Sequence, residues 1–417
     1  MPESRPTPVP LDDRLARGRS DLLDRIEQPP LDRIRHLAAR RRRHGRTLGT
    51  GALAAVAVTL TLLVRPWTGG AGPAPAPPVA ADPTGGPIYG DAGIIINGLT
   101  GPVTDVPGTI TDVEFTDPDH GYLLAECGEG ATCPASVART EDGGVNWQVT
   151  ELPDATRGRT DLDLLAFPDG RLAVAGGTSY VSTDGGRTWQ LGGRAKPLGP
   201  QPGDRPVRQP GSRGADGCGY GVSIWHPDAP VELGPVDTLG ISVCWVASDA
   251  TADGGWWIGG TRDGQAVAAV SRDGGGTWTE TTLGPAAGPA RVQVAVLGGR
   301  AYAVVTSPDG EIRGFFHSVD AGRTFTPVAA GPPAGGPGHL AGELVPLFDG
   351  RLLVAGADNR WYVSSDDGAS FGRAAGNLPT VGRLARTNSG YVAYQLFSNG
   401  WVAYSVDGAT WRKLQIR

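Results

Sequence analysis

Aspartates recur along this 417-residue chain at a nearly constant interval, each inside the same short pattern. The pattern reads Ser/Thr-x-Asp-x-Gly-x-(Thr/Ser/Asn)-(Trp/Phe), one residue shorter in its last copy, and its aspartates are Asp142, Asp184, Asp273, Asp320, Asp366 and Asp407. The carboxylate and hydroxyl of such a turn accept hydrogen bonds from backbone N–H groups, and the aromatic ring packs into a sheet. This pattern therefore predicts a structural role: the hydrogen bonds of each copy stabilise a turn.

Arginines are the first candidates for binding a ligand. Arg171, Arg300 and Arg351 follow glycine-containing turns at equivalent places in three repeats, so they could converge on an anion. Repeats also place one residue type periodically without any shared ligand. The favoured interpretation is that these arginines are solvated or stacked on neighbouring aromatic rings.

Two other segments carry candidate contacts. A Pro/Gly-rich insertion, 197–217, contains Arg205 and Arg208 and is expected to be a loop that covers a binding surface, with disorder as the alternative. Trp245 and the pair 256–257 could stack on a sugar, although alternating strand faces favour core packing for the adjacent pair.

No metal, cofactor or catalytic pattern stands out. The six histidines are scattered without a His-x-x-x-His or His–Glu pair, and the Asp-Gly-Gly strings lack the further acidic ligands of a calcium loop. Gly-x-Ser-x-Gly and phosphate-loop patterns are absent. We therefore expect no cofactor and no catalytic residue.

Cysteines and charge restrict the environment and the partners. The four cysteines suit an oxidising compartment, and we predict the disulfides Cys127–Cys133 and Cys218–Cys244, although four cysteines permit three pairings. The net charge is −6, and the N-terminal tail is basic, so the remainder is more acidic still. An acidic main domain argues against nucleic acid as a partner.

The spacing of the repeats predicts the fold. With Asp228 as a marker inside the one double-length gap, the aspartates are 42, 44, 45, 47, 46 and 41 residues apart, a period typical of propeller blades. A second repeated turn, Phe167-Pro168-Asp169-Gly170-Arg171 and Phe348-Asp349-Gly350-Arg351, is a hairpin signal. In the last repeat we expect strands at 383–387, 391–397, 401–405 and 410–416. The chain is thus predicted to be an all-β propeller of seven, or possibly six, four-stranded antiparallel blades, with 88–96 as a candidate closing strand.

The N-terminus predicts a membrane anchor. Thr47 to Val64 is an uncharged stretch of 18 residues, long enough for roughly 27 Å of helix. Arginines precede it, which places the N-terminus in the cytoplasm and the propeller outside the cell membrane; a cleaved secretory signal is the alternative. We expect a basic tail with short amphipathic helices (1–46), one transmembrane helix (47–64), a Pro/Ala/Gly-rich linker (65–86) and the propeller (87–417).

The boxes resemble those of the Asp-box (BNR) repeat propellers, a group that includes sialidases, sortilin-type receptor ectodomains and the photosystem II assembly-factor propeller. The first repeat, Asp112 to Tyr122, is most similar to the assembly-factor branch. Resemblance to the sialidases implies an arginine triad, a tyrosine nucleophile paired with a glutamate, an acid/base aspartate and an Arg-Ile-Pro phrase. This sequence has no Arg-Ile-Pro, and none of its tyrosines stands in a recognisable Glu-paired context.

These observations predict a binding protein and not an enzyme. We expect a membrane-anchored, extracytoplasmic propeller that binds a still unidentified protein or assembles a complex, because Asp boxes occur in enzymes and non-enzymes alike. A glycan-binding or sialidase-like glycoside hydrolase is the alternative. A structural or sensor module that signals through the anchor to the cytoplasmic tail is a third interpretation.

Overall fold

The computed structural model describes residues 88–417 except 129–131, 161, 177, 193–203, 210–217, 220, 227–228, 237, 239, 248–253, 286–287 and 396–400. The chain divides into two compact units, Met1–Pro75 and Ala76–Arg417, and every described residue belongs to the second. The predicted tail, membrane helix and most of the linker lie outside the described residues. Within the described part, no helix is long and apolar enough to cross a membrane.

The described residues form strands and one short 3-10 helix, η1 (Asp154–Thr156). Sheet 1 contains β3 (Thr109–Phe115), β4 (Gly121–Glu126), β5 (Ser136–Thr140) and β6 (Gln148–Glu151). Sheet 2 contains β7 (Asp163–Ala166), β8 (Leu172–Ala175), β9 (Tyr180–Ser182) and β10 (Gln190–Leu191). Sheet 3 contains β11 (Arg205–Gln209), β12 (Gly221–His226) and β13 (Ala229–Val236).

The C-terminal half repeats the same plan. Sheet 4 contains β14 (Ser242–Ala247), β15 (Trp256–Arg262), β16 (Gln265–Ser271) and β17 (Thr279–Pro285). Sheet 5 contains β18 (Arg291–Leu297), β19 (Arg300–Thr306), β20 (Ile312–Ser318) and β21 (Thr326–Ala329). Sheet 6 contains β22 (Val345–Pro346), β23 (Leu352–Ala355), β24 (Trp361–Ser364) and β25 (Gly372–Arg373). Sheet 7 contains β26 (Arg383–Thr387), β27 (Gly390–Tyr394), β28 (Val402–Ser405) and β29 (Thr410–Lys413), extended by β2 (Ile94–Asn97) and β1 (Ile88–Asp91). The four strands expected in the last repeat are thus confirmed, with shorter ends.

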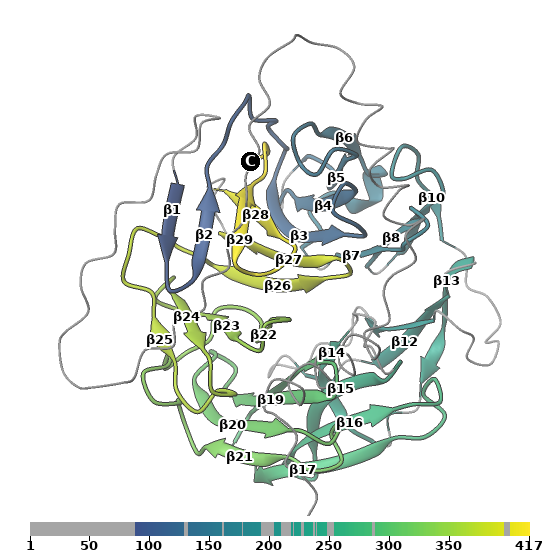
Figure 1. The fold of residues 1–417 in the computed structure, drawn as a ribbon. Helices are drawn as coiled ribbons and strands as arrows, with labels where there is room; N and C mark the ends of the chain where they lie inside the picture. Colours follow the sequence, from purple (N-terminus) through teal and green to yellow (C-terminus); the bar gives the residue numbers. More distant parts are fainter. Residues whose placement is uncertain are drawn as a thin grey trace, which may run out of the picture. The chain divides into compact units, whose positions relative to one another are not determined.

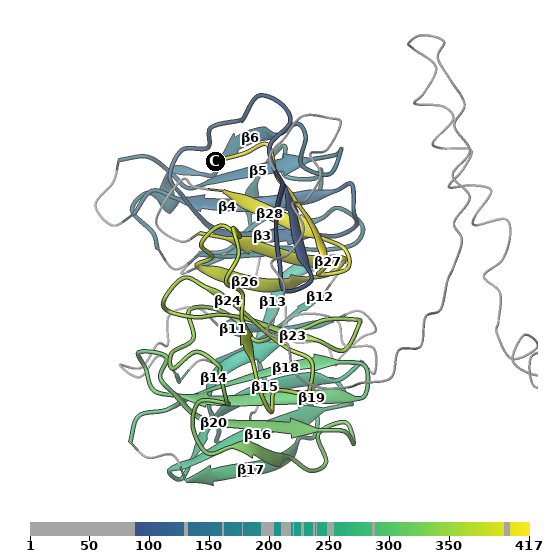
Figure 2. The ribbon, with the colours of Figure 1, turned by 60° about the vertical axis from the view of Figure 1, so that its left-hand side comes forward.

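The sheets are held together by hydrophobic cores that lie between neighbours. Each described core cluster joins two consecutive sheets, from sheets 1 and 2 through to sheets 6 and 7, and a further cluster joins sheet 7 to sheet 1. Both views of the ribbon place β26 and β27 beside β3, where this succession closes (Figures 1 and 2). The second unit is therefore a closed ring of antiparallel sheets, the arrangement of a β-propeller.

Position within a sheet explains the sequence pattern of each strand. Middle strands such as β19 and β27 are buried along almost their whole length, because a neighbouring sheet covers each face. The first strand β18 alternates between buried and half-buried residues, and the last strands β6 and β10 are largely exposed. The polar residues of the first strands consequently face the middle of the ring.

The N-terminal strands close the ring in an unexpected way. The segment 88–96 was expected to supply one closing strand, yet it forms the hairpin β1–β2. Sheet 7 already has four strands of its own, so β2 adds to its outer edge, parallel to β29. Thr104 then pairs with Ile416 in the same parallel sense, which ties the beginning of the ring to its C-terminal end.

Candidate binding site in the central channel

The Asp boxes brace the turns between the third and fourth strands, as predicted. In the box of sheet 4, the Ser271 hydroxyl donates to Asp273 Oδ1 at 2.8 Å and accepts the Gly275 N–H at 2.7 Å. The same carboxylate accepts the backbone N–H of Thr277 at 2.8 Å and its hydroxyl at 2.7 Å. These hydrogen bonds, led by that from the Thr277 side chain, lower the pKa of Asp273 to about 2. The boxes in the other sheets repeat this geometry, and none of the six aspartates lines a described cavity.

Both expected disulfides are present. Cys127 is bonded to Cys133 within sheet 1, across the connection between β4 and β5. Cys218, just before β12, is bonded to Cys244 in β14 and so joins sheet 3 to sheet 4. Sheet 3 has three described strands and no box, so this covalent link fastens the least regular part of the ring.

The three turn arginines do not all converge: Arg300 and Arg351 line one cavity, and Arg171 lies outside it. Arg171 pairs with Asp169 in its own turn, and Arg351 pairs with Asp349 in the same way. Arg300 instead reaches across to sheet 6, where its Nη1 lies 2.8 Å from Asp367 Oδ1. Each arginine is therefore held by a different aspartate, whereas the favoured interpretation expected solvated or stacked side chains.

The expectation that Arg205 and Arg208 lie in a loop was wrong. They belong to β11, the first strand of sheet 3, which pairs along its length with β12. Proline in this segment suggested a loop, but an edge strand tolerates a residue without an N–H, and Val207 is buried between sheets 2 and 3. Arg208 faces the middle of the ring and pairs with Asp163 at 2.8 Å. The remainder of the insertion lies outside the described residues.

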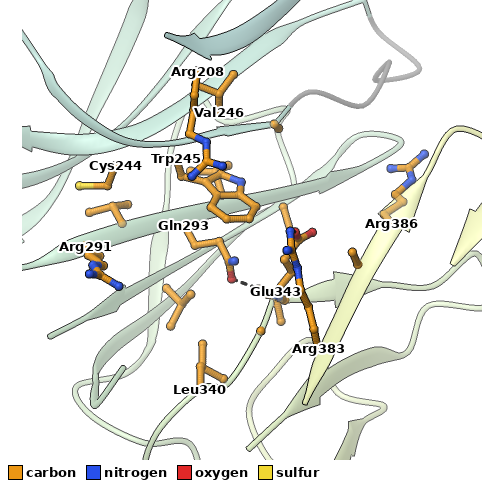
Figure 3. A pocket seen from close by; sticks show the side chains of 18 of the residues that line it. Arg208, Cys244, Trp245, Val246, Arg291, Gln293, Leu340, Glu343, Arg383 and Arg386 are labelled. Carbon is orange, nitrogen blue, oxygen red and sulfur yellow. Dashed lines mark hydrogen bonds and ion pairs between the residues drawn. The ribbon is translucent and has the colours of Figure 1, made fainter. Parts of the chain in front are cut away.

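A cavity of about 470 Å³ occupies the middle of the ring and is the principal candidate site. Residues from the first strand of every sheet line it, so its wall combines segments that are far apart in the sequence (Figure 3). Its polar and charged lining comprises Asp112, Glu114, Asp163, Arg208, Trp245, Arg291, Gln293, Glu343, Arg383 and Arg386. Trp256 and Trp257 are buried in the core, whereas Trp245 faces this cavity.

Arg383 connects several of these groups. Its Nη1 donates to the Thr111 carbonyl oxygen at 3.0 Å, its Nη2 donates to Glu343 Oε1 at 3.2 Å, and its guanidinium lies 5.8 Å from the centroid of the Tyr394 ring. Interaction with Tyr394 and with the carboxylates of Glu343 and Asp112 raises the pKa of Arg383, which is thus always charged. This arginine fastens sheet 7 to sheets 1 and 6 at the cavity wall.

Asp112 is a carboxylate of this wall whose pKa is shifted. Burial raises its pKa, while the charge of Arg383 opposes that shift. Its Oδ2 accepts the Leu164 N–H at 3.1 Å and its Oδ1 accepts the Val113 N–H at 2.9 Å. On the opposite wall, Gln293 Oε1 accepts the Leu344 N–H at 2.8 Å. Polar side chains of the cavity thus also join neighbouring sheets.

The arrangement suits binding better than bond cleavage. An activated tyrosine needs an adjacent base, whereas the Tyr394 hydroxyl donates to the Thr111 carbonyl oxygen at 3.0 Å, and burial raises its pKa. Glu343 and Asp163, which could serve as bases, are each held by an arginine. The cavity wall carries charged groups of both signs and the aromatic ring of Trp245.

Sequence reasoning missed most of the cavity residues, including Asp112, Gln293, Glu343 and Arg383. One local signal existed: in β18, polar Arg291 and Gln293 alternate with buried valines, which marks one face of a first strand as polar. The alternation alone cannot show that seven such faces meet.

Short parts of this chain are similar in sequence to known proteins. The model of the BNR/Asp-box repeat matches residues 180–191, which contain the box of sheet 2. The photosystem II assembly lipoprotein Ycf48 of Synechococcus sp. (strain CC9902) is 34% identical over 80 residues, covering 19% of this chain and 22% of that protein. The chain therefore matches about a fifth of the length of this curated relative.

Solved structures of low sequence identity also match. YCF48 bound to D1 peptide is 17% identical with a TM-score of 0.33, over 74% of this chain and 83% of the other. YCF48 from Cyanidioschyzon merolae is 15% identical with a TM-score of 0.45, over 72% and 94%. The Hadza microbial sialidase Hz136 is 14% identical with a TM-score of 0.37, over 75% and 65%. The chain thus contains a BNR/Asp-box repeat and repeats its box geometry around the ring, and in this it resembles the Asp-box repeat β-propellers.

Proposed function

We propose that this chain is a membrane-anchored, extracytoplasmic, seven-bladed propeller that binds a protein partner or helps to assemble a protein complex without catalysis. Each sheet is taken as one blade, and residues 47–64 as the anchor. The proposal rests on one observation above all: two of the four carboxylates at the cavity wall are already engaged by arginines, Asp163 by Arg208 and Glu343 by Arg383.

The matching relative supports the same class of function. That relative is named an assembly lipoprotein, and we therefore include a role in assembling a complex in the proposal for this chain. A sialidase-like hydrolase has no corresponding support, because Tyr394, which packs on the cavity residue Arg383, bonds to a backbone carbonyl and not to a glutamate.

Position-specific crosslinking in the native membrane tests the proposal. A photo-reactive amino acid replaces Trp245 at the cavity in the tagged full-length protein, and Leu191 at the outer edge of sheet 2 in the control. We expect a discrete crosslinked protein from position 245 and none from position 191. Equal or absent labelling at the two positions would contradict the proposal. Turnover of a fluorogenic sialoside that Arg383→Met abolishes would favour the hydrolase instead.

A further inference from the structure

A second cavity, of about 510 Å³, opens beside the central one on the side of the hairpin turns. The β18–β19 turn (298–299) and the β22–β23 turn (347–351) line it, together with Arg300, Tyr302 and Arg386. Pro346 and Arg386 line both cavities, so the second is a mouth of the central channel. We call it the Phe348 mouth, after the aromatic residue in its wall.

Phe348 is exposed although its turn does not require an aromatic residue. The side chain is 66% exposed. In the matching turn of sheet 2, Phe167 N–H donates to Arg171 O at 2.9 Å; here Leu347 N–H donates to Arg351 O at 2.8 Å. Leu347 is thus the counterpart of Phe167, and Phe348 takes the tip position that proline holds in sheet 2. An exposed phenyl ring at a turn tip leaves apolar surface available to a partner.

Arg386 places an open positive charge beside this ring. Its guanidinium lies 5.8 Å from the centroid of Phe348, and its Nη1 donates to the Val296 carbonyl oxygen at 2.7 Å. Within the described part of the chain it forms no ion pair with a carboxylate, unlike Arg300 and Arg351, which pair with aspartates. An incoming carboxylate would therefore find a cation that is partly desolvated and not yet neutralised.

The charge of the mouth is opposite to that of the protein. Three arginines line it, and Asp367 and Asp349 pair with two of them. Arg386 therefore leaves the mouth with one unbalanced positive charge, whereas the whole chain carries a net charge of −6. A positive mouth on an acidic protein favours acidic partners and disfavours nonspecific contact with basic ones.

We propose that the Phe348 mouth binds an extended acidic segment of a partner protein, with a carboxylate on Arg386 and an adjacent apolar side chain on Phe348. This rests on the proposed function and assigns the place and the chemistry of docking. The segment would approach the channel from the side of the hairpin turns.

Peptide binding to the full-length protein tests the proposal. The probe is a fluorescein-labelled peptide that alternates glutamate and leucine, compared with one that alternates lysine and leucine, by fluorescence anisotropy. We expect binding of the acidic peptide only, weakening as salt rises. Arg386→Gln should raise its Kd about tenfold, and Phe348→Ala several-fold, as for other central arginine and aromatic contacts.

Arg323→Gln is the matched control. Arg323 is an exposed cation in the box of sheet 5, outside both cavities, and its loss changes the net charge equally. We expect less than about a twofold change in Kd. Equal weakening by Arg323→Gln and Arg386→Gln, or no binding of the acidic peptide, overturns the proposal.

Crosslinking from position 245 separates this proposal from the proposed function. If Arg386→Gln and Phe348→Ala leave the yield of the crosslinked partner unchanged, docking at the mouth is refuted while the binding function stands. If the parent protein yields no partner at all, the proposed function fails. A reduced yield in both variants, with Arg323→Gln unaffected, supports docking at the mouth.

Discussion

The serine of an Asp box, and not its aspartate, should contribute most to stability. In sheet 6, Ser364 is 1% exposed, and its hydroxyl accepts the buried Gly368 N–H at 2.9 Å and donates to Asp366 Oδ1 at 2.8 Å. Ser364→Ala leaves that N–H without its acceptor, at a cost of about 1–3 kcal/mol. Asp366 is exposed and can turn to water, so the second bond adds at most about 1 kcal/mol. We expect the free energy of unfolding to fall by about 2–3 kcal/mol.

The neighbouring serine provides a control of the same chemistry. Ser365 is exposed, so Ser365→Ala should change the free energy of unfolding by no more than about 0.5 kcal/mol. Urea unfolding with linear extrapolation measures both variants, and an unchanged slope shows that the unfolded state is the same. If the two substitutions cost the same, the buried hydroxyl is not what holds the turn, and the reasoning is refuted.

Three other outcomes follow from the structure. The backbone N–H of Thr188 is the main cause that lowers the pKa of Asp184 from its ordinary 3.8 to about 2. Between these two values the unfolded chain binds more protons, so the stability that Asp184 contributes is complete above about pH 4 and declines toward pH 2. A urea midpoint that stays constant from about pH 5 to about pH 2.5 would contradict this. Replacing Cys218 and Cys244 together by serine removes a disulfide with a sequence separation of 26 and should lower the free energy of unfolding in urea by about 3–4 kcal/mol. A loss below about 1 kcal/mol would mean that the disulfide does not stabilise sheet 3. Arg383→Met should lower the free energy of unfolding by about 2 kcal/mol, less than the full loss of a buried pair because the cavity hydrates the site. A double-mutant cycle with Glu343→Gln should show coupling between the two residues, and additive effects would exclude that coupling.

Local chemistry accounts for what could be predicted from the sequence. An Asp box is held by hydrogen bonds between residues two and four positions apart, as from Ser364 to Asp366 and Gly368, so its pattern is complete in one short segment. The strands of the last repeat follow from alternation and turn residues for the same reason. In the turn that contains Phe348, the sequence alone does not say which of two adjacent apolar residues is buried, and the structure buries Leu347 and exposes Phe348.

The repeating unit, the all-β class, the two disulfides and the structural role of the boxes follow from the sequence. That β11 is a strand, that β1–β2 extends sheet 7 and that particular polar residues meet at the channel is known from the folded chain alone. Glu343 and Arg383 are 40 residues apart, and Arg383 and Thr111 are 272 apart. No short-range pattern encodes such pairs, since they form only when the packing of buried side chains between consecutive sheets closes the ring.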